Sequence, residues 1–218
     1  MRRAFDAVGA PEIRRRAFGF HGLLRTIVGQ QVSSAAGDSI WRKIETAFDP
    51  LTPEILLAAS DEALRALGFS RAKARYARAL AHAVETGSLD MAGLEALDDA
   101  EARRLLMALP GIGPWTADIY LMFCLGRPDV WPVGDLALAI AAQRLLKLRK
   151  RPTPDRLERI GAQWQPWRSA AAQLLWRYYT VAPTAVSRAQ SRQKPAGDPS
   201  LAPGRRSRPS GPGRPDRA

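Results

Sequence analysis

Apolar residues recur every three or four positions along most of the chain, which is the spacing of amphipathic helices. The segment from about 20 to 31 shows this, with Leu23, Leu24, Ile27 and Val28 on one face. No segment convincingly alternates apolar and polar residues as a half-buried strand does. Helices are predicted over about 20–31, 34–48, 71–86, 98–108, 114–125, 135–148 and 168–179, with others beginning after Thr52, Ser60 and Thr153. The pattern therefore predicts an all-α domain of many helices.

Two glycines lie between the helices predicted on either side of residue 111. In the segment LPGIGPWTA at 109–117, Gly111 and Gly113 lack the Cβ atoms that would keep another molecule away from the backbone. Pro114 suits the first position of the second helix, and the free amides that follow it can bind a phosphate. This is a helix-hairpin-helix pattern, which is typical of proteins that bind the DNA backbone without sequence specificity. An ordinary tight turn between two packed helices could have the same residues.

Asp135 lies where a loop broken by proline and glycine enters an apolar helix. By itself, an aspartate at this position indicates an N-cap, whose carboxylate accepts hydrogen bonds from the first amides of the helix. These amides and the helix dipole favour the ionised carboxylate. A lasting negative charge is also what a developing sugar cation, or a water oriented toward it, requires. Asp135 is therefore both an expected cap and a candidate catalytic residue.

Aromatic residues on two predicted helices are candidates for a binding pocket. Trp115 lies at the start of the second hairpin helix, Ile119 shares its face, and Trp176 lies midway along the last predicted helix. Tryptophans on helices usually belong to the hydrophobic core. In a pocket, their π faces would attract a cationic, alkylated base more strongly than a neutral one.

Polar residues at two other helix boundaries are candidates for DNA contact. Gln30, Gln31 and Ser33 lie between the first two predicted helices, and Ser70 and Lys73 begin a later one. A loop-borne amide can fill the gap that an extruded nucleotide leaves in a duplex. Solvated polar residues at helix ends would give the same pattern, so both interpretations stay open.

The formal net charge of +12 makes a polyanion the leading class of partner. Residues 184–218 contain eight Lys and Arg against two Asp, many Pro, Gly and Ser, and almost nothing apolar. Such a segment buries too little surface to order itself. We therefore expect a folded domain over 1–183 and a disordered basic tail over 184–218.

The chain contains one cysteine, Cys124, and two histidines, His21 and His82. This set excludes an internal disulfide and is too small for a structural zinc site or an iron–sulfur cluster. No apolar run after Met1 resembles a signal sequence, and none has the length of a membrane span. We expect a cytoplasmic protein without membrane contact.

Five features together resemble a known family. They are GQQVS at 29–33, GFSRAK at 68–73, LPGIGPWTA at 109–117, the aspartate at 135 and WQPWRS at 164–169. In this order and spacing they are similar to the helix-hairpin-helix DNA glycosylases, specifically the DNA-3-methyladenine glycosylase II branch. The resemblance covers about residues 18–179 and excludes the basic tail.

This resemblance implies a two-lobed α-helical fold with a DNA cleft between the lobes. Asp135 would be the catalytic aspartate, while Trp115 and Trp176, with Ile119, would line the pocket for the flipped base. The residues implied to contact DNA are Gly111, Gly113, Thr116, Gln30, Gln31, Ser33, Ser70 and Lys73, with Gln31 at the position of the wedge residue. No cofactor is expected for catalysis, but a structural sodium or potassium ion would be held by the backbone carbonyls of Met107, Leu109 and Ile112.

Four differences from patterns in the wider family bear on mechanism, substrate and domain content. Relatives with lyase activity carry lysine where this chain has Trp115, so no Schiff base is expected and water would be the nucleophile. Ile119 replaces a pocket tyrosine of some members, and Asp118 replaces an asparagine. The match already begins at about residue 18, so the β-rich N-terminal domain of larger members is not expected.

The sequence therefore predicts a monomeric, monofunctional glycosylase of base excision repair that acts on damaged double-stranded DNA. Its expected substrates are alkylated purines, 3-methyladenine and also 7-methylguanine, whose positive charge makes the base a good leaving group. One alternative is a glycosylase for another damaged base. Another is a noncatalytic helix-hairpin-helix DNA-binding protein, for which Asp135 and the tryptophans would be unnecessary.

Overall fold

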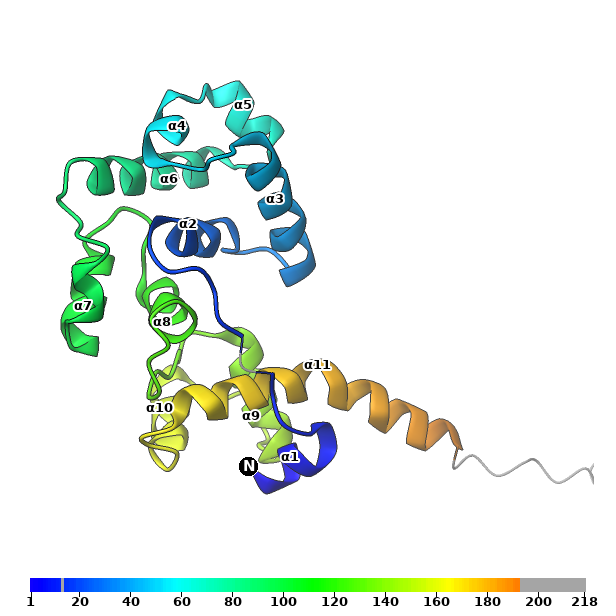
Figure 1. Ribbon diagram of the computed structural model, residues 1–218. Helices are drawn as coiled ribbons and strands as arrows, with labels where there is room; N and C mark the ends of the chain where they lie inside the picture. Colours follow the sequence, from blue (N-terminus) through cyan, green and yellow to red (C-terminus); the bar gives the residue numbers. More distant parts are fainter. Residues whose placement is uncertain (13, 193–218) are drawn as a thin grey trace, which may run out of the picture. The chain divides into compact units, whose positions relative to one another are not determined.

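The computed structural model describes residues 1–12 and 14–192, and within them the chain is helical with no strand (Figure 1). The all-α prediction is confirmed. The elements are α1 (Arg2–Val8), α2 (Phe20–Val28), α3 (Ser34–Ala47), α4 (Pro53–Ala58), α5 (Asp61–Ala66), α6 (Arg71–Glu85), a 3₁₀ turn η1 (Gly93–Glu95), α7 (Asp99–Met107), α8 (Pro114–Phe123), α9 (Leu136–Leu145), α10 (Pro154–Ala162) and α11 (Arg168–Arg192).

Most of these helices begin at a residue whose side chain accepts a hydrogen bond from an amide in the first turn. The capping residues are Ser33, Thr52, Ser60, Ser70, Asp98, Asp135 and Thr153. Each such cap stabilises a helix by about 1 kcal/mol relative to alanine. The helix starts predicted from these residues are confirmed.

The two ends of the described chain differ from the sequence prediction. Helix α1 was not predicted, because its seven residues bury only Ala4 and Val8 and so show no clear periodicity. Helix α11 was predicted to end near residue 179 but continues to Arg192. Residues 184–192 contain Ala, Arg and Gln, which favour helix, and neither Gly nor Pro. The expected disorder of the remaining tail concerns residues 193–218, which lie outside the described part.

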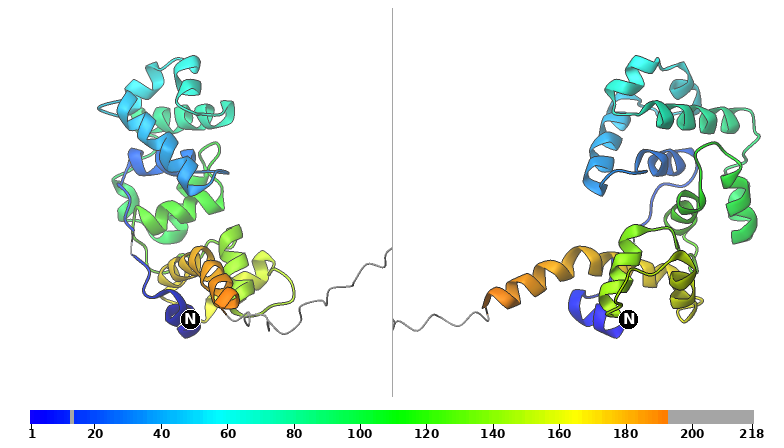
Figure 2. Two further views of the ribbon diagram at one scale, coloured as in Figure 1. Left: turned by 90° about the vertical axis from the view of Figure 1, so that its right-hand side faces the viewer. Right: turned by 180° about the vertical axis from the view of Figure 1, so that it is seen from behind.

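The residues divide into two units, Met1–Pro183 and Thr184–Ala218, and the hydrophobic core belongs to the first. Helix α2 is central to it, since it packs against α3, α6 and α8. Helices α4 and α5 pack on α6, and α7 packs on α8 (Figure 1). Helices α1, α9, α10 and α11 form a second group of neighbours (Figure 2). One continuous core joins both groups, with residues from α1 to α11.

None of the described helices is both long enough and apolar enough to cross a membrane.

Candidate active site: an aspartate held by two indoles

The hairpin between α7 and α8 depends on one glycine with a left-handed backbone. Gly111 has a φ of 81°, and a Cβ added there would lie 2.2 Å from the ring of Tyr76 on α6. Any side chain at this position would therefore be strained and would collide with the ring. Gly113 differs, because its backbone is extended and an added Cβ would meet nothing within 4 Å. The bare backbone at Gly113 faces open space.

The start of α8 has the unpaired donors of an anion-binding helix end. Gly113 is the N-cap and offers no side chain, and Pro114 has no N–H. The Ala117 amide donates to the Gly113 carbonyl, whereas the amides of Trp115 and Thr116 have no partner within the described residues. Two amides and the positive end of the helix dipole thus remain available to a phosphate.

Gln30 supports this hairpin from the residues that follow α2. Its Nε2 donates to the Gly111 carbonyl and to the Thr116 hydroxyl, both at 2.9 Å. Thr116 is itself buried, at 3% exposed, and its hydroxyl accepts the hydrogen bond from Gln30. Gln31 is exposed and has a φ of 56°. The DNA contacts predicted for these residues stay predictions, but the structure gives the Gln30 amide a clear internal role.

Three other predicted DNA-contacting residues are also used internally. Ser33 caps α3, and Ser70 caps α6 by accepting from the Lys73 amide at 3.2 Å. The Lys73 ammonium donates to the Val28 carbonyl at the end of α2, at 2.7 Å, and partial burial lowers its pKa. These contacts are the ordinary structural interpretation of each residue, and direct phosphate contact by them stays a prediction.

Asp135 lies at the centre of a convergent set of donors. It is the N-cap of α9, and its Oδ1 accepts from the Leu138 amide at 2.7 Å. The indole Nε1 of Trp176 on α11 donates to the same oxygen at 2.9 Å. The indole Nε1 of Trp115 on α8 donates to Oδ2 at 2.8 Å. Three donors from three helices thus fix one carboxylate, and a fixed negative charge can stabilise a developing cation.

Both indoles are half-buried rather than sealed in the core. Trp176 stacks on Phe123 with ring centroids 5.8 Å apart, and the Arg16 guanidinium lies 5.1 Å from the Phe123 centroid. Phe123 was not singled out from the sequence, because an aromatic on an apolar helix gives no signal beyond core packing. Ile119 is buried, at 4% exposed. Its contact with a base stays a prediction.

Asp118 forms a charge pair between the two hairpin helices. Its Oδ1 lies 2.5 Å from Arg103 Nη2 on α7, with side chains 5% and 40% exposed. The two groups are close but not aligned, since Asp118 Oδ1 has no hydrogen bond within the described residues. Burial raises the pKa of Asp118 to about 6, against the opposing charge of Arg103.

The backbone carbonyls predicted to hold a monovalent cation accept few hydrogen bonds from the described residues. Those of Met107 and Ile112 accept no hydrogen bond from the described residues, and that of Leu109 accepts only from the Ile112 amide at 3.2 Å. Carbonyl oxygens with unused lone pairs are suitable ligands for a hard cation. The three carbonyls therefore have acceptor capacity to spare, and the ion itself stays a prediction. No cluster of three or more His, Cys, Asp or Glu that could hold a metal occurs in the described residues.

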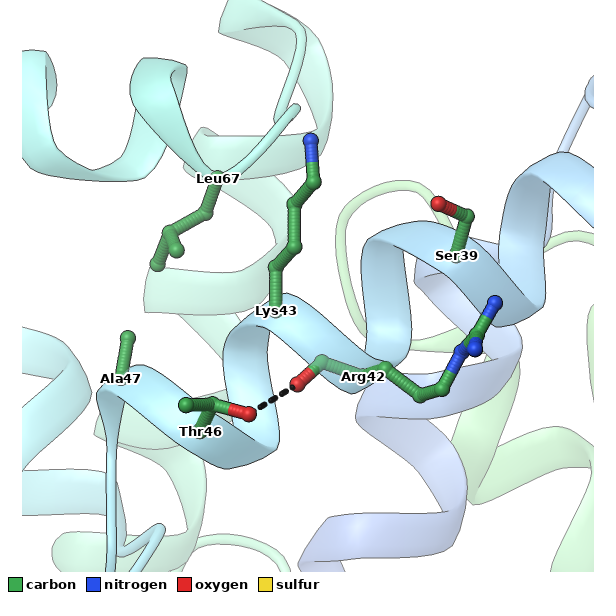
Figure 3. A pocket seen from close by; sticks show the side chains of 6 residues that line it. All are labelled: Ser39, Arg42, Lys43, Thr46, Ala47 and Leu67. Atoms are coloured by element: carbon green, nitrogen blue, oxygen red, sulfur yellow. Dashed lines mark hydrogen bonds between the residues drawn. The ribbon is translucent and has the colours of Figure 1, made fainter.

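Two open surface depressions lie apart from Asp135 and the two indoles. One runs along α3 and is lined by Ser39, Arg42, Lys43, Thr46, Ala47 and Leu67 (Figure 3). The other lies on α7 and is lined by Ala100, Arg103, Arg104, Met107 and Ala108. Neither includes Asp135 or the two indoles.

The glycine turn, the unpaired amides at the start of α8 and the Asp135 carboxylate bonded to Trp115 of that helix define a helix-hairpin-helix protein with an acidic site next to its hairpin. The chain belongs to the HhH-GPD superfamily of base excision DNA repair proteins, whose pattern matches residues 24–166. This family membership confirms the resemblance inferred from the sequence.

Similar proteins agree with this assignment. The chain is 29% identical over 166 residues to the putative DNA-3-methyladenine glycosylase YfjP of Bacillus subtilis, covering 72% of this chain and 58% of the relative. It is 30% identical over 164 residues to DNA-3-methyladenine glycosylase 2 of Escherichia coli, covering 70% and 55%. The chain thus spans little more than half the length of these two relatives.

A solved structure covers more of the fold. The 3-methyladenine DNA glycosylase Mag1 of fission yeast, in complex with abasic DNA, superposes with a TM-score of 0.77 at 30% identity. The match covers 81% of this chain and 89% of that one.

Proposed function

We propose that this protein is a monofunctional DNA glycosylase that removes alkylated purines, 3-methyladenine and also 7-methylguanine, from double-stranded DNA. The observation that carries the proposal is the Asp135 carboxylate fixed by the indoles of Trp115 and Trp176 beside the hairpin. The names of the similar proteins, which are DNA-3-methyladenine glycosylases, support the same substrate class.

In this mechanism the alkylated nucleotide leaves the duplex and places its base against the two indoles. A base with a formal positive charge is attracted to their π faces and leaves without general-acid help. The ionised Asp135 stabilises the positive charge that develops on the sugar and orients the attacking water. Trp115 offers no amine, so no Schiff base forms and no strand cleavage follows.

The hairpin would hold the DNA while this reaction takes place. The free amides of Trp115 and Thr116 suit one phosphate, and the open backbone at Gly113 lets the strand approach closely. Gln31, exposed between α2 and α3, would fill the gap in the duplex. The carbonyls of Met107, Leu109 and Ile112 would hold a sodium or potassium ion that neutralises charge near that phosphate.

The proposal also includes a monomer that acts in the cytoplasm. A strongly basic chain and a hairpin with free amides both suit a DNA partner. The single cysteine, Cys124, is compatible with a reducing compartment.

The test is release of free base from methylated duplex DNA, measured by mass spectrometry. The wild-type protein should release 3-methyladenine, and Asp135→Asn should reduce the single-turnover rate by at least about 100-fold while binding of abasic duplex stays within threefold. Asp155→Asn, an exposed acid in the first turn of α10, is the matched control and should excise normally.

Each other result points to a different protein. Release of oxidised or deaminated bases instead would make it a glycosylase for those lesions. Tight duplex binding without release of any base would make it a noncatalytic DNA-binding protein. Full activity in Asp135→Asn would remove the assigned role of that residue.

A further inference from the structure

The loop that carries Asp135 has no regular structure of its own. It runs from the end of α8 at Phe123 to the start of α9, and Asp135 is its last residue. A catalytic carboxylate at the end of a free loop would be poorly placed. The loop is instead bonded to the first residues of α11, the helix that also carries Trp176.

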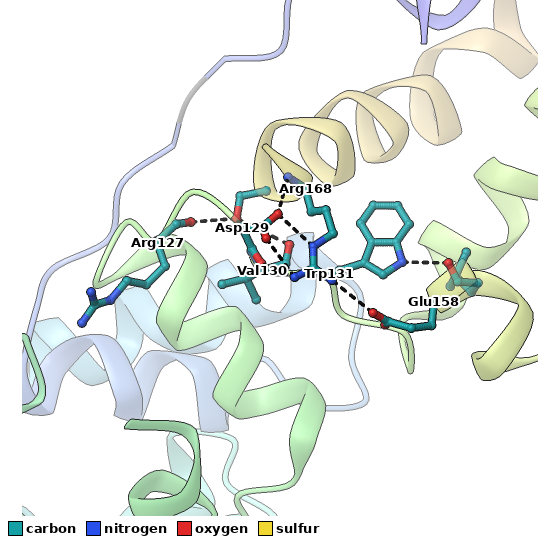
Figure 4. Close-up of polar contacts among 8 residues, drawn as sticks. Arg127, Asp129, Val130, Trp131, Glu158 and Arg168 are labelled. Atoms are coloured by element: carbon teal, nitrogen blue, oxygen red, sulfur yellow. Dashed lines mark hydrogen bonds and ion pairs between the residues drawn. The ribbon is translucent and has the colours of Figure 1, made fainter. Parts of the chain in front are cut away.

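Arg168, the first residue of α11, forms an ion pair with Asp129 in the middle of this loop (Figure 4). Its Nε and Nη2 donate to Oδ1 and Oδ2 at 2.8 and 2.9 Å, which is a bidentate pair. Its Nη2 also donates to the Asp129 carbonyl at 3.0 Å, and its Nη1 donates to Glu158 on α10 at 3.1 Å. The guanidinium lowers the pKa of Asp129, and the two side chains are only 17% and 25% exposed.

Ser169, the next residue, binds the loop on both sides of Asp129. Its buried hydroxyl donates to the Arg127 carbonyl at 2.7 Å and accepts from the Val130 amide at 3.0 Å. Its own amide donates to the Pro128 carbonyl at 3.0 Å. Together with Arg168, it leaves four consecutive loop residues, 127–130, bonded to the start of one helix.

The loop between this contact and the site is short and also anchored. The indole Nε1 of Trp131 donates to the Leu157 carbonyl on α10 at 2.9 Å. Its ring packs on Gly161, where an added Cβ would lie 2.4 Å from Nε1. The Asp135 amide then donates to the Pro132 carbonyl at 2.9 Å. These contacts restrict movement of Asp135 relative to residues 127–131.

We propose that Arg168 and Ser169 are positioning residues that set the Asp135 carboxylate against the Trp176 indole. The inference rests on the proposed glycosylase function. Arg168 and Trp176 are eight residues apart on α11, about 12 Å along one rigid helix. The same helix thus holds both the loop that carries the acceptor and the indole that donates to it. A displacement of about 1 Å at a reacting group can lower a rate by up to about 100-fold.

The test compares Arg168→Met and Ser169→Ala with Arg78→Met. Arg78 is a matched control, because it also pairs with an aspartate, Asp61, and donates to a backbone carbonyl, but between α6 and the α4–α5 region. Both positioning variants should lower the single-turnover excision rate by about 10- to 100-fold while duplex affinity stays within twofold. Ser169→Thr, which keeps the hydroxyl, should recover most of the rate of Ser169→Ala.

A second readout does not depend on activity. In ¹H–¹⁵N spectra, the indole Nε1–H signals of Trp115 and Trp176 should shift and exchange faster in Arg168→Met and Ser169→Ala, and should be unchanged in Arg78→Met. If Arg168→Met fails to fold, Ser169→Ala alone decides.

Rates within twofold of wild type, with unchanged indole signals, would overturn the proposal. Equal losses of rate and DNA affinity in these variants would also overturn it, because they would indicate general loss of structure. A wild-type protein that excises nothing would refute the proposed function, while the indole signals would still decide whether α11 positions Asp135.

Discussion

The burial of Asp118 should make the free energy of unfolding fall as pH rises through the pKa of this carboxyl group. Its pKa rises from 3.8 to about 6 on folding, because burial disfavours the ionised carboxylate more than Arg103 favours it. The folded state therefore binds this proton more tightly than the unfolded state. The stability it contributes is fully present below pH 3.8 and is lost as pH rises through 6. The loss amounts to about 3 kcal/mol, of which about 2 kcal/mol falls between about pH 4.5 and 7.5.

Asp118→Asn removes this titration with little change in shape. The partner Arg103 is 40% exposed and can be hydrated when the charge opposite it is removed. The stability of the variant relative to wild type should rise by about 2 kcal/mol between about pH 4.5 and 7.5. For a folded unit of this size, that corresponds to a gain in Tm of roughly 4–8 °C.

Urea unfolding of both proteins across this pH range measures the difference directly. Asp155→Asn, at an exposed position, is the control and should follow wild type at every pH. Arg103→Met should raise the pKa of Asp118 further and lower stability above pH 6. A constant difference between Asp118→Asn and wild type across the range would refute the reasoning, as would a variant that becomes relatively less stable with rising pH.

Two further predictions concern the donors and the glycines of the site. Trp176→Phe keeps an aromatic face but removes one donor to Asp135, so the single-turnover rate should fall about tenfold with unchanged duplex affinity; an unchanged rate would show that this hydrogen bond is dispensable. Gly111→Ala should lower the free energy of unfolding by at least about 2 kcal/mol, because of the φ of 81° and the collision with the Tyr76 ring. Gly113→Ala should fold normally but bind duplex DNA about tenfold more weakly. Equal stability of the two alanine variants in urea would contradict this distinction.

Much of the helical architecture could be predicted from the sequence, because its signals are local. Capping residues such as Asp98 and Asp135 mark helix starts within one turn of chain, and the structure places both as predicted. Helix α1 escaped prediction because only Ala4 and Val8 face the core.

Contacts between residues far apart in the sequence could not be predicted from local sequence patterns. Asp135 and Trp176 are 41 residues apart, and only the family resemblance suggested that they share a site. Ser70 and Lys73 illustrate the opposite case, since a cap and a phosphate contact use the same residue types at the same helix end. The structure gives both residues internal hydrogen-bond partners.

The donors around Asp135 also limit how many further hydrogen bonds its carboxylate can accept. A carboxylate has about four lone-pair positions, and two donors already occupy Oδ1. A third donor occupies Oδ2. Among the described residues one acceptor position stays free, on Oδ2, and under the proposed mechanism a cationic sugar mimic would donate to it. If the proposed function holds, tight-binding inhibitors should therefore be compact cations with a single N–H directed at that oxygen.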